Sequence, residues 1–244
     1  MHIELAAETL FHLGPLPVTN TLFTTLLITL LLTFFAWKTT RSLSLVPSGL
    51  QNLTEMIFEP INSLVRDLAH DRAKLFFPIV TTFFLLILVS NWFGLLPGVG
   101  TIGFFTTDHG EEKFLPLLRA PTSDLNMTLA LALLSMVITH VLSIKLLGFG
   151  TYLSKFFSIN PIFLFVGLIE LVSEFTKIVS LSFRLFGNIF AGETVLTSIS
   201  ALGAFIFPLP FLALEIIVGF VQALVFMMLT LVFLSLLTEK QHAH

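Results

Sequence analysis

Long apolar segments alternate with short polar segments along this chain. Five runs of at least 20 residues contain no Asp, Glu, Lys or Arg. An apolar helix of about 20 residues crosses the roughly 30 Å hydrocarbon core of a bilayer. The pattern therefore predicts an all-α membrane protein, a single integral domain over residues 1–244 with about five transmembrane helices. The predicted membrane helices cover 18–37, 76–96, 126–147, 161–200 and 211–237.

The segment 161–200 is too long for a helix that crosses a bilayer upright. At about 1.5 Å per residue it would reach roughly 60 Å, twice the hydrocarbon thickness. We therefore expect this helix to be strongly tilted, bent or partly horizontal. A turn near Gly203 joins it to 211–237, so the last two helices should form a long antiparallel hairpin.

The segment 50–72 has a different pattern, with apolar residues at helical spacing opposite polar ones. Its apolar positions are Leu53, Ile57, Ile61, Leu64 and Leu68. Such a pattern is typical of an amphipathic helix that lies on the membrane surface. The polar segment 106–124 is predicted to be a loop.

Composition supports a membrane protein and removes several classes of chemistry. Hydrophobic residues make up 55% of the chain and charged residues 11%, against about 25% charged in a soluble domain. The net charge of −3 gives no indication of a nucleic-acid partner. With no cysteine, the chain has no disulfide and no thiolate metal site. We expect no cofactor and no metal, and a lipid bilayer as the surroundings.

The basic residues predict the orientation of the chain in the membrane. One side collects eight of them: Lys38, Arg41, Arg66, Arg72, Lys74, Lys145, Lys155 and Lys240. The other side has only Lys113 and Arg119. Because Lys and Arg accumulate in cytoplasmic loops, we expect the N-terminus outside and the C-terminus in the cytoplasm.

Polar side chains recur along one face of the predicted helix 161–200. They are Glu170, Ser173, Lys177, Ser180, Arg184 and the small Ala191, spaced three, four or seven apart, with Asn188 at the edge. Lipid rejects such a stripe, so it indicates a protein interface or a wet path. Arg184 is the strongest functional candidate, because its charge is permanent and costs at least about 2.5–3.5 kcal/mol near the bilayer centre. We interpret Glu174, off the stripe, as an interfacial charge, and His140 as a packed residue.

Two acidic residues are predicted to meet in the antiparallel hairpin. Glu215 and Gln222 share one face of the last helix, and residues of the two helices whose numbers add to a constant lie level. Counting this way places Gln222 level with Arg184, and Glu215 level with Glu193. Glu193 projects away from the stripe. Two carboxyl groups in one buried site cannot both ionise cheaply, which suits proton exchange.

The run "SLSFRLFGNIFAGE", preceded by "ELVSEFTK" and followed by "LEIIVGFVQALVFMMLTLVFLS", resembles the membrane-embedded a subunits of F-type ATP synthases. "APTSDLNMTLALAL" extends the resemblance over most of the chain. It implies a non-catalytic, proton-translocating stator subunit whose Arg184 faces a rotating ring of c subunits and separates two half-channels. Peripheral-stalk b subunits would be further partners.

The resemblance also implies roles for individual residues. Asn188 and Gln222 would be polar neighbours of the arginine. Glu193, Glu215 and Asp124 would line the outer half-channel, and Glu170 and Ser180 the cytoplasmic one. Many bacterial members have histidine where this chain has Glu215. A bacterial plasma membrane is the expected location, with a plastid thylakoid membrane as the alternative.

Two other classes of protein compete with this interpretation. A secondary transporter would use Arg184 to bind an anionic solute, but the chain lacks an internal repeat and a Gly- or Pro-broken helix beside that residue. A structural scaffold would not need so many polar groups at membrane depth. Proton and sodium coupling both stay open, because ion-binding groups in this family lie mainly on the c subunit.

Overall fold

The structure is a computed structural model that describes residues 7–14, 16–41, 44, 49–108, 111–157, 161–200, 203 and 206–239. It confirms the predicted fold class, an all-α membrane protein, with two short β-hairpins in addition. The helices are α1 (Asn20–Thr40), α2 (Leu50–Ala69), α3 (Ala73–Gly94), α4 (Leu125–Leu147), α5 (Phe149–Phe156), α6 (Pro161–Ser200) and α7 (Pro208–Thr238). Short 3-10 turns lie at η1 (His70–Arg72) and η2 (Pro121–Ser123). Among the described residues, four helical segments can cross a membrane by length and composition, or five if the bent pair α5 and α6 is one span.

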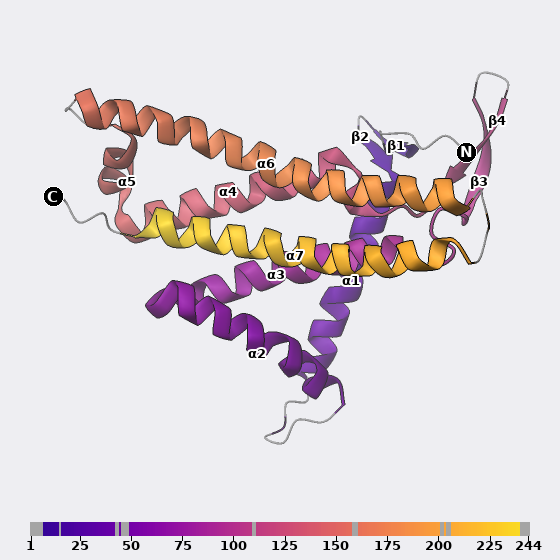
Figure 1. The fold of residues 1–244 in the computed structure, drawn as a ribbon, viewed down its shortest axis with the longest axis horizontal. Coiled ribbons are helices and arrows are strands. Elements are labelled where there is room, and N and C mark those ends of the chain that lie inside the picture. Colours follow the sequence, from indigo (N-terminus) through magenta and orange to yellow (C-terminus); the bar gives the residue numbers. More distant parts are fainter. Residues whose placement is uncertain are drawn as a thin grey trace.

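The long helices form a layer that α1 crosses steeply. In Figure 1, α3, α4, α6 and α7 run along the long axis of the molecule, and α1 passes across them. With 21 residues, α1 is about 31 Å long and matches the hydrocarbon thickness. The 40 residues of α6 exceed it twofold, so α6 and the adjacent α7 must be strongly tilted if α1 spans the bilayer.

The core of the layer is apolar, and a few hydroxyl groups join its helices. Phe76, Phe226 and Leu185 are among the buried residues that pack α3, α6 and α7 together. Thr128 and Ser182 are hydrogen-bonded over 3.2 Å between α4 and α6, and Ser135 and Thr230 over 2.9 Å between α4 and α7. Such hydroxyl pairs hold membrane helices together where lipid offers no hydrophobic driving force.

Part of the segment predicted as a loop is a hairpin. Strands β3 (Gly103–Asp108) and β4 (Glu111–Pro116) pair antiparallel, and a second hairpin joins β1 (Thr9–Leu13) to β2 (Leu16–Thr19). The aromatic and β-branched residues of β3 favour extended backbone. Gly103 permits the pairing, because a Cβ there would overlap the carbonyl oxygen of Leu115.

Two side chains bind the C-terminal end of α7. Lys155 of α5 donates from Nζ to the carbonyl oxygens of Leu237 (2.8 Å) and Glu239 (2.9 Å). Ser143 donates to the same Leu237 oxygen over 2.6 Å. The last carbonyls of a helix lack intrahelical partners and carry partial negative charge, so a lysine there satisfies and stabilises them.

We predict that Lys155→Met lowers the thermal stability of the purified protein. A hydrogen bond from a charged donor contributes about 1.5–3 kcal/mol, and methionine removes both bonds from Nζ to the end of α7. Lys145→Met is the matched control, because Lys145 is exposed on α4. Thermal unfolding in detergent would show a lower midpoint for the first variant only, and equal midpoints would contradict the prediction.

Candidate functional site

Helix α6 has one buried face and one open face. Leu181, Leu185 and Ile189 belong to the core. A second face stays exposed and carries polar and small residues: Ser173, Ser180, Arg184, Asn188 and Ala191. We call these five residues the open face of α6. The 3.6-residue period of the helix separates the two faces, as the spacing in the sequence predicts.

Arg184 lies on the open face without a partner. Among the described residues it forms no hydrogen bond or ion pair, so neither Glu170 nor Glu193 neutralises it within this chain. Its guanidinium group keeps its charge at any accessible pH. A bare cation of this kind is too costly against lipid, so protein or water must cover this face in the membrane.

A hydrogen bond joins the open face to α7 one turn beyond Arg184. Asn188 donates from Nδ2 to Oε1 of Gln222 over 2.7 Å. Gln222 is 3% exposed, and its Nε2 group has no hydrogen-bond partner in the described part of the chain. The structure thus brings together Asn188 and Gln222, whereas the residue count had placed Gln222 level with Arg184. The Nε2 group of Gln222 can therefore still donate a hydrogen bond to another polar group.

Glu193 of α6 and Glu215 of α7 lie close to each other where the two helices pack. Glu215 is 7% exposed, and Glu193 is close enough to interact with it electrostatically. Oε2 of Glu193 is buried and lacks a hydrogen bond within the described ranges. A Cβ at Gly192 would overlap the carboxyl group of Glu215, so only glycine lets this carboxyl lie against α6. The pair can share one proton more easily than it can carry two charges.

Asp124 stands apart from this acid pair and holds helices in place. Its Oδ2 accepts a 2.8 Å hydrogen bond from Oγ1 of Thr21 in α1, and its Oδ1 accepts from the backbone N–H of Asn126. It is therefore the N-cap of α4. In the described residues no hydrogen bond connects Asp124 to Glu193 or Glu215.

Two hydrogen bonds in series link η2 through α3 to α7. Thr122 of η2 donates to Oδ1 of Asn91 over 2.7 Å, and Asn91 donates from Nδ2 to the carbonyl oxygen of Gly219 over 2.9 Å. Gly219 lies one turn from Glu215. Asn91, Thr122 and Gly192 were not predicted from the sequence. The sequence pointed to Asn91 only as an asparagine inside an apolar span, and to Gly192 only as a small residue beside Glu193.

Two further predicted residues precede Arg184 along α6. Glu170 is half-buried and interacts electrostatically with Lys155. Ser180 is exposed on the open face, one turn before Arg184. Glu170 precedes the arginine by 14 positions, about 21 Å along the helix.

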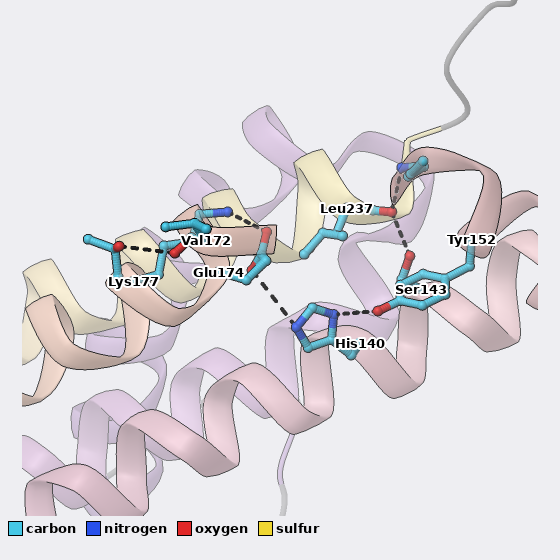
Figure 2. Close-up of polar contacts among 9 residues, drawn as sticks. His140, Ser143, Tyr152, Val172, Glu174, Lys177 and Leu237 are labelled. Atoms are coloured by element: carbon cyan, nitrogen blue, oxygen red, sulfur yellow. Dashed lines mark hydrogen bonds and ion pairs between the residues drawn. The ribbon is translucent and has the colours of Figure 1, made fainter. Parts of the chain in front are cut away.

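The interpretation of Glu174 as an interfacial charge is wrong. Glu174 is 6% exposed and faces inward between α4 and α6. It pairs with Lys177 and lies opposite His140, as Figure 2 shows. A buried carboxylate needs a positively charged or hydrogen-bonding partner. Lys177 lies one turn further along α6, and His140 lies on the neighbouring helix α4.

The described residues contain no cluster of three or more His, Asp or Glu side chains able to hold a metal ion. The candidate site therefore consists of fixed charge, carboxyl groups and amides arranged around α6 and α7.

Comparison with known proteins identifies a family with these features. The sequence model of the family described as ATP synthase A chain matches residues 21–235. ATP synthase subunit a of Moorella thermoacetica is 33% identical over 93% of this chain and 94% of its own. ATP synthase subunit a 3 of Pelobacter propionicus is 35% identical over 95% and 92%. ATP synthase subunit a of Campylobacter jejuni subsp. jejuni serotype O:6 is 37% identical over 89% of each chain. By the extent of these matches, this chain belongs to the ATP synthase A chain family.

Proposed function

We propose that this chain is the proton-translocating stator subunit of a rotary F-type ATP synthase, in which Arg184 separates two half-channels that lead to the c ring. Membership of the family makes the chain a subunit of the ATP synthase complex, and a non-catalytic role is part of the proposal. The observation that carries the finer proposal is the open face of α6, where Arg184 has no partner among the described residues. The c ring is the covering that this face requires.

In this mechanism a ring carboxyl group changes its charge as it passes Arg184. The nearby fixed cation favours the carboxylate, so the ring carboxyl gives up its proton there. Once the ring has carried it into lipid, the carboxyl must be neutral, because a bare carboxylate is too costly. Arg184 also repels protons that would otherwise pass directly between the half-channels. Each proton that crosses is worth about 2.3 kcal/mol per 100 mV, and this free energy drives rotation only if the direct route is blocked.

The residues around Arg184 divide into two paths. Glu193 and Glu215 exchange protons with the outside, and Asn188 with Gln222 lies between this pair and the arginine. Asp124 supports the outer path by fixing α1 against α4. Glu170 and Ser180, which precede Arg184 along α6, border the cytoplasmic path.

The basic residues support an orientation with the N-terminus outside and the C-terminus in the cytoplasm. The relatives are bacterial, which supports a bacterial plasma membrane as the location.

Peripheral-stalk b subunits are the proposed partners that keep this subunit from turning with the ring. No contact in the described residues favours a solute transporter.

We predict that Arg184→Ala abolishes ATP-driven proton pumping in inverted membrane vesicles while the complex still assembles. The physical reason is that alanine removes the permanent charge that discharges the ring carboxyl. Arg66→Ala is the matched control, because Arg66 is exposed on α2. Coupled pumping by the assembled Arg184 variant would contradict the proposal.

The two acids should behave as one site. Glu193→Gln and Glu215→Gln should each slow proton entry from the outside, and the double variant should lose much less than the sum of the two losses. Interacting groups that share a proton are not additive, and coupling free energies of about 0.5–3 kcal/mol are usual for contacts. The measurement is a double-mutant cycle on the rate of proton uptake, and strict additivity would rule out a shared site.

Gly192→Ala should slow proton entry from outside about as much as Glu215→Gln does. A methyl group at this position displaces the Glu215 carboxyl without altering any charge. Gly150→Ala serves as the control, since a Cβ at Gly150 meets no atom within 4 Å. If both glycine variants conduct protons like the wild type, the close packing of Glu215 on α6 has no part in the path.

A further inference from the structure

A connected set of polar side chains crosses from α5 through α4 to α6, at the end of α6 away from the acid pair. Oη of Tyr152 is hydrogen-bonded to Nδ1 of His140 over 3.0 Å. Nε2 of His140 lies 3.8 Å from Oε2 of Glu174, and Nζ of Lys177 lies 2.7 Å from Oε1 of Glu174. Figure 2 shows these groups pointing toward one another between the helices.

These side chains border a cavity of about 250 Å³ between α4, α5 and α6. Most of its lining is apolar, and its polar members are His140, Tyr152 and Glu174. A water molecule occupies about 30 Å³ of liquid volume and needs two to four polar partners. The cavity therefore has room for several waters, and these three groups can hydrogen-bond them.

Glu174 has one occupied and one available carboxylate oxygen. Oε1 is held by Lys177, whose ammonium group also lies 4.8 Å from the centre of the Phe233 ring of α7. Oε2 is buried and has no hydrogen bond within the described residues. The 3.8 Å separation from His140 is longer than a hydrogen bond, so this oxygen can still accept one from water.

Lys177 connects this cluster to the side of α6 that carries the open face. It belongs to the same stripe as Ser180 and Arg184, and its side chain is 24% exposed. Glu174, three residues earlier, points off that stripe and into the cavity. The carboxyl group thus lies between the cavity and the surface that we assign to the c ring.

We propose that Glu174 is a proton-exchanging group of the cytoplasmic path, held in place by His140 and Tyr152 as positioning residues. The proposal rests on the proposed function, which places this end of α6 on the cytoplasmic side. When Glu174 releases a proton, the O–H bond at Oε2 breaks and water in the cavity takes the proton toward the cytoplasm. The carboxylate that remains forms an ion pair with Lys177.

The positioning residues act through the tautomer of the histidine. If Tyr152 donates its O–H to Nδ1 of His140, the neutral imidazole carries its proton on Nε2, which faces Glu174. That N–H stabilises the Glu174 carboxylate, while the transferred proton binds to Glu174 and not to His140. The charged and titratable groups facing Glu174 are then His140 from α4, Tyr152 from α5 and Lys177 from α6, while Lys155 interacts with Glu170, Glu239 and Arg72.

The test measures passive proton conduction through the membrane part of the complex, in inverted vesicles stripped of the catalytic head. A potassium diffusion potential drives protons, and the pH on the cytoplasmic face is varied while the pH on the other face is held constant. We expect Glu174→Gln to lower the rate by roughly a hundredfold, the lower end of what a positioned proton-transfer group contributes. The variant should also change the dependence of the rate on cytoplasmic pH, and not its dependence on outer pH.

Two further variants separate a proton path from a structural role. Tyr152→Phe removes one hydroxyl and keeps the ring, so it should alter the cytoplasmic pH dependence with little effect on assembly. Glu174→Asp should restore much of the rate, because it restores the carboxyl group. Glu59→Gln is the matched control for a lost acid, since Glu59 is exposed on α2.

Two results would overturn the proposal. One is an assembled Glu174→Gln complex with wild-type rate and pH dependence, and the other is a loss that is uniform at every cytoplasmic pH and is not rescued by aspartate. Should Glu174→Gln fail to assemble, Tyr152→Phe with wild-type cytoplasmic pH dependence would overturn it instead. Failure of the proposed function itself gives a different result, because an Arg184→Ala complex would then still pump protons.

Discussion

The structure depends on the constraint that a permanent positive charge cannot face lipid. Arg184 cannot lose its proton and has no partner within the described chain. Its helix therefore needs a covering of protein or water on one side and an apolar core on the other. Leu181, Leu185 and Ile189 supply the core side, and hydroxyl pairs such as Thr128 with Ser182 fix the helix against its neighbours.

The same helix separates two groups of carboxylates. Glu193 and Glu215 meet on one side of the arginine, where Gly192 leaves room for a carboxyl group against the backbone. Glu174, which is 6% exposed, borders a cavity toward the other end of α6. Each group contains a buried carboxylate oxygen with no hydrogen bond among the described residues. Such an oxygen is costly to maintain for stability alone, and its presence on both sides fits proton exchange at both.

Helical periodicity made much of this arrangement predictable. The apolar runs predicted the membrane helices, and the three- and four-residue spacing predicted the open face of α6. Counting residues across the hairpin brought Glu193 to Glu215. The structure joins Gln222 to Asn188, one turn beyond the Arg184 that the count had paired with it. The contacts of Glu174 with His140 and of Asn91 with Thr122 were not predictable, since they join segments far apart in sequence. Hairpin β3–β4 was hidden by its charged residues, which are typical of loops.

The central claim is that Arg184 blocks a direct proton route between two half-channels. The most direct measurement is passive proton flux with the c ring covalently fixed to this subunit, through a cysteine introduced at Ala191 in a chain that has none of its own. A fixed ring cannot carry protons by rotation, so any flux that remains is a direct leak. The account predicts no flux with Arg184 in place and measurable flux in the Arg184→Gln variant. A fixed Arg184→Gln complex as tight as the wild type would contradict it.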